Sequence, residues 1–460
     1  MNNYFYNMVD PDEMATLEYI PTIPKFLEFI KKQYSDYPAI SDKVTTYTYE
    51  ELVSRVAKRV TFINSLGLEK GSNIAVLAKN DLDAMELFLA IPAAGHVLIM
   101  LPNALNDKAL AGISMKFDLA GMFVGKEFTE VTANLPCKTW SSTSIGETES
   151  TFADVEKDTT AAIFFTGGTT GAPKGAVHSH GSIMRGSFNG VFGPGSILHK
   201  RYIAMLPLSH IFGAIMGYMA KLYTGSLTYT CTDMRAGIGD IPVVRPTTLV
   251  LVPGLVEIIL NIAKLKGRAF LGDLELIMCG AAPVPPRQME ECRELGITLC
   301  AGYGLTECAN LTSGNCDTDK KPESMGHIYP EQQVKVVDGE LWIKGDNVMK
   351  EYYKDPEHTA EVLEDGWFKT GDLVEFDDND WIYITGRIKN LIILPNGENV
   401  SPEEIEELFY KQLLVKDCLV QEMEMNGNTV IGVEIIPYMP ELDGASEEEI
   451  QNRLQETVNE

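Results

Sequence analysis

Positive charge is scarce in this sequence. The chain has 460 residues, with 38 lysines and arginines against 65 aspartates and glutamates, and its formal net charge is -27 at pH 7. Such a chain repels the phosphates of DNA, RNA and anionic lipids, which excludes nucleic-acid binding as a main role. A single nucleotide is still a permitted ligand, because a local ring of backbone N–H donors and one or two cations outweighs distant, screened charge.

Long apolar runs are also lacking. The most apolar stretch, Leu249 to Ala263, is interrupted by Pro253, Gly254 and Glu257. It is shorter than the roughly 20 residues that a membrane-spanning helix needs. We therefore predict no integral membrane segment and expect this stretch to be buried core. The N-terminus has no cationic start and carries acids before any apolar run, so it is not a secretory signal, and we expect the mature chain to begin there.

The cysteines lack the spacing of metal sites. Eight are present, but no Cys-x-x-Cys pair and no partnering His-x-x-x-His pattern accompanies them. We therefore expect reduced thiols and a cytoplasmic location.

The order of apolar segments predicts an α/β protein. A strand-like run at 74–77 is followed by a helical pattern at 82–94 and a second strand-like run at 95–101. Alternation of this kind predicts a large N-terminal domain of two mostly parallel sheets covered by helices. Further strand candidates lie at 202–206, 227–230, 248–252 and 274–279.

The pattern of predicted secondary structure changes after about Pro322. Short β-type segments at 334–337 and 340–344 flank an Asp338-Gly339 turn, and they predict a small β-rich subdomain over about 322–386. We place the domain boundary after Gly386, which gives a domain at 1–386 and a small, mobile α+β domain at 387–460. Ser401 and Pro402 form a good helix start in the second domain.

Residues 166–175 form a loop dense in glycine and threonine behind the apolar run 161–165. Glycines let the backbone approach an oxyanion, threonine hydroxyls donate hydrogen bonds, and Lys174 supplies a mobile positive charge. A plain flexible turn is the simpler alternative. A P-loop does not fit, because Lys174 follows Pro173, which has no N–H to donate, and precedes Gly175 rather than Ser or Thr.

Further motifs follow in a consistent order and identify a family resemblance. Together with the 165–175 loop, they resemble the motifs of the adenylate-forming (AMP-binding) superfamily, in its acyl-CoA synthetase and aryl-CoA ligase branch. The resemblance runs from about Tyr47 to Glu406. The segments are Thr46-Tyr-Thr-Tyr-Glu-Glu-Leu52, Gly280-Ala-Ala-Pro283, Gly302-Tyr-Gly-Leu-Thr-Glu307, Asp365-Gly-Trp-Phe-Lys-Thr-Gly-Asp372 and Gly386-Arg-Ile-Lys389.

The resemblance implies an activity in two steps. A carboxylic acid, fatty or aryl, reacts with ATP to give an acyl-adenylate and pyrophosphate, and coenzyme A then takes the acyl group. The implied small molecules are the acid, ATP with Mg²⁺, and coenzyme A, and a homodimer is left open. Two alternatives also stay open, namely a domain that loads an acid onto a carrier-protein thiol and a nucleotide-binding protein that has lost catalysis.

The resemblance also implies roles for the motif residues. Thr306 would bind the α-phosphate, Glu307 would ligate Mg²⁺, and Asp372 would accept hydrogen bonds from the ribose with Arg387 nearby. The alternative for Glu307 is an ordinary surface acid, and Asp372 taken alone could equally be a turn cap. The β- and γ-phosphates would be held by Thr166, Gly167, Gly168, Thr169, Thr170, Gly171 and Lys174, and the adenine would contact Gly280, Ala281, Ala282, Tyr303 and Gly304.

Other positions also carry a structural alternative. His210 would line or gate the acid site, although a histidine beside apolar residues is often structural. Lys389 would be the hinge lysine or else a solvated linker residue, and Gly397 would line the pantetheine tunnel or only form a turn. His178 and His180 are weaker candidates that could simply pack in the core.

The family pattern breaks near the end of the chain. Relatives carry a late lysine that bridges the carboxylate and the α-phosphate, whereas no lysine follows Lys416 here. We expect the C-terminal domain to be incomplete, because the chain stops inside a helix-like stretch at 446–458. ATP binding with poor adenylation is the expected behaviour of this polypeptide.

Overall fold

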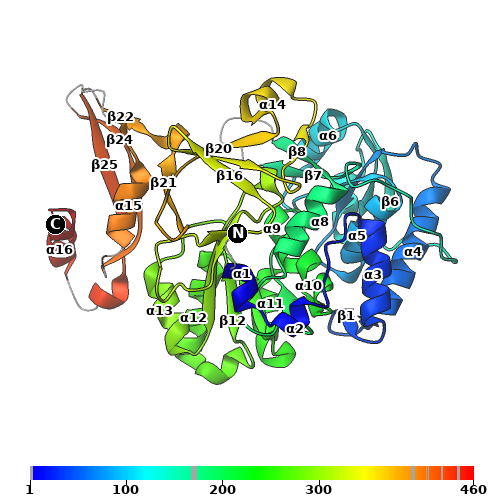
Figure 1. The fold of residues 1–460 in the computed structure, drawn as a ribbon, viewed down its shortest axis with the longest axis horizontal. Helices are drawn as coiled ribbons and strands as arrows, with labels where there is room; N and C mark the ends of the chain where they lie inside the picture. The colour runs from blue at the N-terminus through cyan, green and yellow to red at the C-terminus, as the bar shows by residue number, and fades with distance from the viewer. Residues whose placement is uncertain are drawn as a thin grey trace.

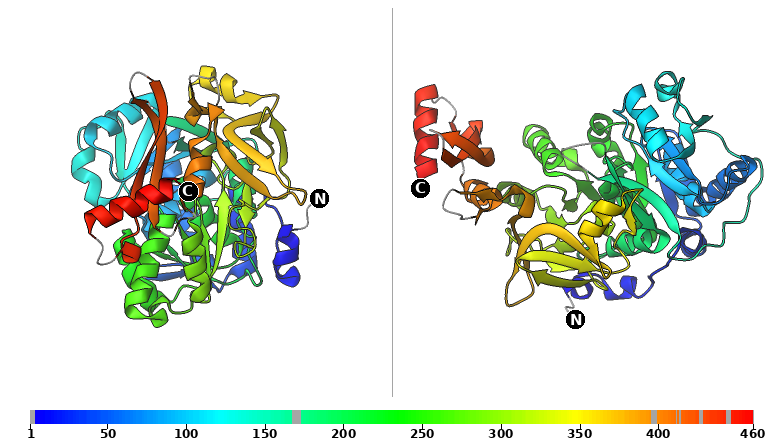
Figure 2. Two further views of the ribbon diagram at one scale, coloured as in Figure 1. Left: turned by 90° about the vertical axis from the view of Figure 1, so that its left-hand side faces the viewer. Right: turned by 90° about the horizontal axis from the view of Figure 1, so that it is seen from above.

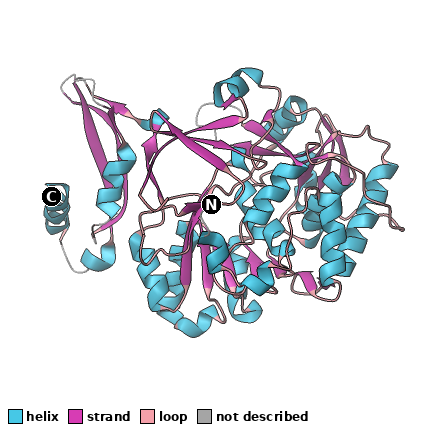
Figure 3. Ribbon diagram, in the orientation of Figure 1, coloured by secondary structure: helices cyan, strands magenta, loops and turns pink. Residues whose placement is uncertain are grey.

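The protein is a mixed α/β structure with several sheets, which confirms the predicted fold class (Figures 1 and 3). This computed structural model describes residues 4–166, 173–394, 399–410, 412, 414–425, 428–442 and 446–459.

The predicted β-α-β order around residue 74 is confirmed in a seven-stranded sheet. Its central strand, β3, pairs in parallel with β4 and β5. Along β3, Ile74 and Val76 face one buried cluster, while Ala75 and Leu77 face another. Both faces of this strand are therefore covered, as in most parallel sheets. The strand order is β18 (Glu351–Tyr352), β8 (Lys174–Ser179), β7 (Thr160–Thr166), β4 (Val97–Met100), β3 (Asn73–Leu77), β5 (Leu119–Val124) and β6 (Lys138–Ser141).

Two further sheets lie beside the first. In one, β9 and β10 are parallel, and in the other β11, β12 and β13 are parallel before β14 and β15 reverse direction. The antiparallel strands at the edge make the second sheet mixed. The first sheet has the order β2 (Thr46–Thr48), β1 (Pro38–Ser41), β10 (Leu227–Thr230) and β9 (Arg201–Ala204), and the second has the order β11 (Thr248–Leu251), β12 (Leu276–Cys279), β13 (Thr298–Tyr303), β14 (Ser313–Asn315) and β15 (His327–Ile328).

Helices pack around these three sheets, as Figure 1 shows. The apolar stretch that begins at Leu249 forms β11 and the first turns of α12, both largely buried. Within the described residues, no helix combines the length and apolarity needed to cross a membrane. The principal helices are α3 (Ile23–Tyr34), α4 (Tyr49–Ser65), α5 (Leu82–Ala93), α6 (Asp107–Lys116), α8 (His180–Asn189), α11 (Met234–Val244), α12 (Pro253–Lys266) and α13 (Pro286–Glu294).

The β-type segments after Pro322 form a separate antiparallel sheet. Its first two strands are joined at Asp338 and Gly339, whose φ angles are +50° and +84°. Positive φ at both turn residues is the geometry that a tight hairpin requires, and Asp-Gly supplies it at little cost. The strands are β16 (Gln333–Val337), β17 (Glu340–Lys344), β20 (Trp367–Phe376), β19 (Leu363–Glu364) and β21 (Ile382–Arg387).

The C-terminal segment lies at one end of the molecule (Figures 1 and 2). Its helix α15 (Pro402–Tyr410) begins at Pro402, as expected, and is followed by β24 (Val415–Met425), β25 (Asn428–Pro437) and α16 (Glu447–Asn459). Side chains of the described part of this segment reach back to the larger part. Lys416 pairs with Glu257 at 3.3 Å, and the Arg287 guanidinium lies 3.8 Å from the centre of the Tyr438 ring. The division at 386/387 stays a prediction.

One expectation about the cysteines is wrong. Cys300 and Cys316 are joined in a disulfide, with 4.2 Å between their Cα atoms. The physical reason is strand pairing, because Ala301 of β13 lies opposite Asn315 of β14 and the next pair along the ladder is the two cysteines. The separation of 16 residues contains no motif that announces this pair. Six other cysteines in the described chain are free.

A buried ion cluster joins α4 to α5. The Arg59 side chain is fully buried and donates hydrogen bonds to Glu86 and Asp83 and to the carbonyls of Ser142 and Ser144. Glu86 is also fully buried and accepts a further bond from Arg55. Every charge in the cluster therefore has an opposite partner, which is the condition for burying charge without a large penalty.

Removing Glu86 should be strongly destabilising. We expect Glu86→Ala to lower the free energy of unfolding by about 3–5 kcal/mol, because it leaves buried guanidinium groups without their main partner. The control is Glu290→Ala in the exposed Glu290–Arg293 pair, which should cost about 0–1 kcal/mol. Urea titration measures both, and equal losses would contradict the assignment.

Candidate active site

The hairpin of β7 and β8 carries the first group of predicted residues. Thr166 ends β7, Lys174 begins β8, and the two residues are directly paired. The loop between them therefore starts and ends at the same end of these two neighbouring strands. The predicted phosphate-binding residues Gly167, Gly168, Thr169, Thr170 and Gly171 lie outside the described residues.

Lys174 lies close to Glu307 through a shared neighbour, Tyr352. The ammonium nitrogen of Lys174 is 5.2 Å from the centre of the Tyr352 ring. The Tyr352 hydroxyl donates a 2.7 Å hydrogen bond to Oε1 of Glu307. Strand β18 makes this contact possible, since it pairs antiparallel with β8. Burial and the adjacent Glu307 carboxylate both raise the pKa of Tyr352, so the phenol stays protonated and continues to donate.

His178 fixes the backbone next to Glu307. It lies on β8 and is fully buried, with Nε2 2.8 Å from the carbonyl oxygen of Thr306 and Nδ1 3.1 Å from Oγ of Ser182. A carbonyl can only accept, so Nε2 carries the proton. Burial lowers the pKa of His178 to about 4. His178 is therefore a neutral support for the Thr306–Glu307 turn, and His180, also buried, accepts from the N–H of Ile23.

Asp372 is the centre of a second cluster. Its carboxylate is 1% exposed, and it accepts hydrogen bonds from Tyr303 Oη at 2.5 Å and from Arg387 Nε at 2.7 Å. Asp372 and Arg387 face each other across β20 and β21, whereas Tyr303 ends β13 in a different sheet. Burial raises the pKa of Asp372, while the two donors oppose that rise.

The Gly280 segment follows β12 in the chain and lies in space next to Phe212, in the helix that His210 caps. A Cβ at Gly280 would meet the carbonyl oxygen of Gly302 at 3.1 Å and the Phe212 ring at 3.5 Å. Ala281, the next residue, has a φ of +68°, a strained conformation for a residue with a Cβ. Ala282 continues the same turn. These contacts place the Gly280 and Gly302 motifs side by side.

His210 and Gly304 each have a defined local role. Nδ1 of His210 accepts a 3.3 Å hydrogen bond from the N–H of Phe212 and so caps α9 (Ile211–Ala214), while the ring stays exposed. At Gly304, a Cβ would collide with the carbonyl oxygen of Asn310, so the residue there must be glycine. This close approach to Asn310 constrains the backbone that leads into Leu305 and Thr306.

Of the two remaining predicted residues, only Lys389 is among the described residues, and it is not part of this constellation. Lys389 lies in a short turn, η5 (Ile388–Asn390), and its side chain is exposed. Gly397 lies outside the described residues. Just before this turn, Ser401 packs closely against β21, because a Cβ at Gly386 would clash with the Ser401 hydroxyl.

The arrangement provides the parts that a phosphoryl-transfer site needs. Lys174 and Arg387 are cationic, Glu307 and Asp372 are anionic, and Tyr303 and Thr306 lie between them on one short segment. Cations of this kind offset charge on a reacting phosphate, and carboxylates bind a hard metal ion or hydroxyl groups. Sequence reasoning missed Tyr352, because nothing in the local Glu351-Tyr-Tyr353 run identifies Glu307, 45 residues away, as its partner.

Comparisons with known proteins agree with this geometry. The family model described as AMP-binding enzyme matches residues 27–353. A feruloyl-CoA synthase of Amycolatopsis is 28% identical over 398 residues, covering 82% of this chain and 80% of that protein. A 2-succinylbenzoate–CoA ligase of Listeria monocytogenes is 27% identical over 379 residues, covering 81% and 80%. The predicted resemblance to the CoA-ligase branch of the superfamily is thereby confirmed.

Solved structures share the fold. O-succinylbenzoate CoA synthetase (MenE) from Bacillus subtilis, in complex with its acyl-adenylate intermediate, superposes with a TM-score of 0.80 at 22% identity, covering 94% of this chain and 91% of that one. ATP-bound MatB from Rhodopseudomonas palustris superposes with a TM-score of 0.82 at 23% identity, covering 94% and 92%.

The hydrogen bond from Tyr303 to Asp372 should stabilise the fold measurably. We expect Tyr303→Phe to lower the free energy of unfolding by about 1–3 kcal/mol, because it leaves a buried carboxylate with one partner fewer. The matched control is Tyr383→Phe, which removes a half-buried hydroxyl that Lys321 contacts at 3.3 Å and should change stability by about 0.5 kcal/mol or less. Urea denaturation distinguishes them, and an equal effect would count against the buried pair.

His178 should make the protein sensitive to acid. Its pKa is about 4 in the folded state against the usual 6.5, so between these values only the unfolded chain takes up the proton. Stability is therefore lost as the pH falls through this window, at about 1.4 kcal/mol per pH unit for one group. His178→Gln keeps a donor for Thr306 but does not titrate.

The measurement is urea denaturation at pH 7 and pH 5. We expect the variant to lose about 2 kcal/mol less than the wild type over this interval. Burial also lowers the pKa values of His96 and His180 to about 4, but both residues remain in both proteins, so their contributions cancel in the comparison. Identical pH profiles would show that His178 does not titrate as described.

Proposed function

Because this chain belongs to the family of AMP-binding enzymes, we propose that it activates a carboxylic acid with ATP and passes the acyl group to coenzyme A. The acid would form an acyl-adenylate with release of pyrophosphate, and the thiol of coenzyme A would then displace AMP. The observation that carries the proposal is the convergence of Lys174, Thr306–Glu307 and the Asp372 cluster on the segment that follows β13.

The phosphate side of the site is the part nearest Lys174. A carboxylate attacking the α-phosphate brings two anions together, so the enzyme must place positive charge and donors around the transferring group. We propose that Lys174 and Thr166, at the two ends of the hairpin loop, contact the β- and γ-phosphates, and that Thr306 contacts the α-phosphate. His178 holds the Thr306 carbonyl and is thus a positioning residue for this contact.

Glu307 fits a magnesium ligand. One carboxylate oxygen accepts from Tyr352, and among the described residues nothing donates to the other. Those residues contain no cluster of three or more metal-binding side chains. A lone carboxylate suits Mg²⁺, which commonly uses one or two protein ligands together with substrate phosphates and water. When bound, the ion would neutralise charge on the phosphates.

The nucleoside side of the site is the Asp372 cluster. We propose that Asp372 accepts hydrogen bonds from the ribose hydroxyls, with Arg387 beside the same sugar. The Gly280–Ala282 turn, Tyr303 and Gly304 would flank the adenine. The hydroxyl of Tyr303 already holds Asp372 in place, which supports a ring orientation fixed before the nucleotide arrives.

The acid and the acceptor are proposed from the relatives. Feruloyl-CoA synthase and 2-succinylbenzoate–CoA ligase both take their names from aromatic acids, which favours an aryl acid over a fatty acid. Coenzyme A is favoured over a carrier protein for the same reason. The exposed His210 at the start of α9, whose Phe212 touches Gly280, would line the acid site. We also propose that residues 387–460 move about Lys389.

A panel of carboxylic acids tests the proposal. We expect pyrophosphate release that depends on an aryl or fatty acid, and AMP release that increases when coenzyme A is added. Lys174→Ala and Asp372→Ala should each lower the rate at least about 100-fold, because each removes a group that contacts the reacting nucleotide. Calorimetry should show weaker ATP binding for Asp372→Ala.

The control is Lys157→Ala, which removes a surface lysine paired with Asp346 and should leave the rate unchanged. Folding of each variant is checked by its melting temperature. Full activity in either Lys174→Ala or Asp372→Ala would falsify the assigned site. If AMP release needed a carrier protein and ignored coenzyme A, the acceptor proposed here would be wrong.

A further inference from the structure

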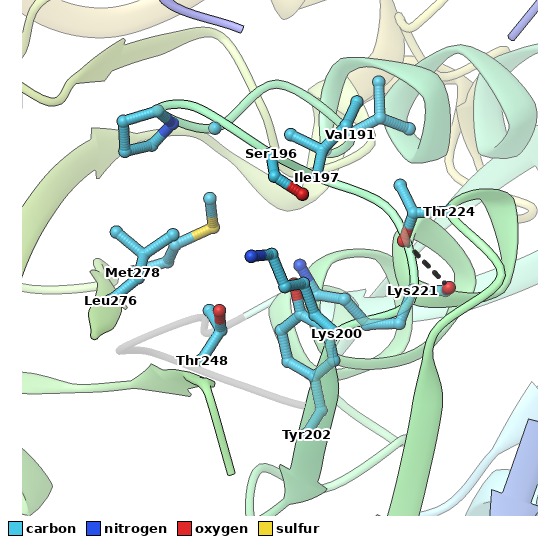
Figure 4. A pocket seen from close by; sticks show the side chains of 13 residues that line it. Val191, Ser196, Ile197, Lys200, Tyr202, Lys221, Thr224, Thr248, Leu276 and Met278 are labelled. Carbon is cyan, nitrogen blue, oxygen red and sulfur yellow. Dashed lines mark hydrogen bonds between the residues drawn. The ribbon is translucent and has the colours of Figure 1, made fainter. Parts of the chain in front are cut away.

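A small cavity lies between two sheets, outside the candidate active site (Figure 4). It has a volume of about 20 Å³. Its walls come from the segment after α8, the first residues of β9, β11 and β12, and the end of α10 (Ala220–Tyr223). The polar side chains on the lining are Ser196, Lys200, Tyr202, Lys221, Thr224 and Thr248.

The cavity and the candidate active site lie at opposite ends of the same parallel strands. Thr248 and Leu276 are the first residues of β11 and β12, whereas the Gly280 turn follows the last residue of β12. A strand rises about 3.3 Å per residue, so along β12 Leu276 lies roughly 13 Å from Gly280, and Met278, which also lines the cavity, lies roughly 7 Å from it. No residue of the cavity lining belongs to the motifs discussed above.

Lys221 is an unusual buried cation. Its side chain is 2% exposed and lines the cavity, with Nζ 4.3 Å from the centre of the Tyr202 ring. Among the described residues, no ion pair or hydrogen bond to its ammonium group is found. Burial lowers the pKa of Lys221 to about 7, and no nearby carboxylate opposes that shift. An ammonium group in this position lacks the anion that buried charges normally require.

A second lysine reaches the same space. Lys200 is half-buried, lines the cavity, and has no ion pair within the part of the chain that the structure describes. Figure 4 shows the Lys200 and Lys221 side chains extending toward the space between Ser196, Thr248 and Met278. The cavity lining contains no carboxylate that could pair with either lysine.

The nearby Glu13 carboxylate does not pair with these lysines. Glu13 approaches the rim, but its carboxylate accepts hydrogen bonds from Ser196 Oγ and from the N–H groups of Ile197 and Leu198. It is not part of the lining. The contrast with Arg59 is direct, because that buried cation has Glu86 and Asp83 as partners. In a chain with 65 acids and 38 basic residues, two neighbouring lysines without an acid are unexpected.

We propose that this cavity is a binding site for one small monovalent anion of halide size, held between Lys221 and Lys200. The volume is slightly more than one water molecule needs, which admits chloride and leaves out a nucleotide or an acyl acid. The Ser196 and Thr224 hydroxyls already donate to Glu13 and to the Lys221 carbonyl, so the two ammonium groups would hold the anion. The anion would join β9, α10, β11 and β12 at the end of the sheets opposite to the candidate active site.

Chloride is the probe, and its ³⁵Cl NMR linewidth reports binding. We expect the chloride linewidth to be larger with the wild-type chain than with a Lys221→Met variant. Added bromide should compete for the site and remove this difference. The melting temperature of the wild type should be several degrees lower in sodium gluconate than in sodium chloride at equal ionic strength, because chloride binds the folded state. Lys221→Met should melt at the same temperature in both salts.

Two further variants, Lys200→Met and Lys157→Met, test whether the effect belongs to this cavity. Methionine has nearly the shape of the lysine stem, so Lys221→Met should fold, and Lys200→Met serves as a second, more exposed removal of charge that should also reduce the broadening. Lys157→Met removes a surface lysine and should behave as the wild type does. If wild type and Lys221→Met broadened chloride equally, or if the wild type melted at one temperature in both salts, there would be no anion site here.

Discussion

A buried carboxylate, Asp372, holds the candidate site together. It lies on β20 of the small antiparallel sheet, and a carboxylate that is 1% exposed is tolerated only if its oxygens are paired. Arg387 pairs with one oxygen from the next strand, and Tyr303 pairs with the other from the end of β13. The second bond crosses from one sheet to another, so it sets the position of the segment that leads to Thr306 and Glu307.

Strand β8 positions the residues around Lys174 and Glu307. It pairs with β7, which brings Lys174 opposite Thr166, and with β18, which brings Tyr352 to Glu307. His178 of the same strand holds the Thr306 carbonyl. One strand thus positions residues from three distant parts of the chain: Thr166 and Lys174 stand on paired strands, and Thr306 and Glu307 stand on a turn that His178 and Tyr352 contact.

Two buried cations show how differently the protein treats internal charge. Arg59 is surrounded by Glu86, Asp83 and two carbonyls, and it stabilises the contact between α4 and α5 as a satisfied cluster. Among the described residues, the ammonium group of Lys221 has only the Tyr202 ring beside it. Because the interior penalises unpaired charge, the first cluster is explained by the chain itself, whereas the second points to a partner from solution.

The sequence by itself determined the family, the α/β class and most of the motif residues, because these depend on local patterns. The strand at β3, the helix start at Pro402 and the Asp338-Gly339 hairpin follow from periodicity, capping and turn chemistry, which act over a few residues. Only the tertiary structure decided that Tyr352 meets Glu307, that Tyr303 bonds to Asp372, that Cys300 is joined to Cys316, and that Lys221 is buried without an acid. Each of these depends on strand pairing or packing between distant segments, and no pattern within one segment specifies which residue will lie across from it.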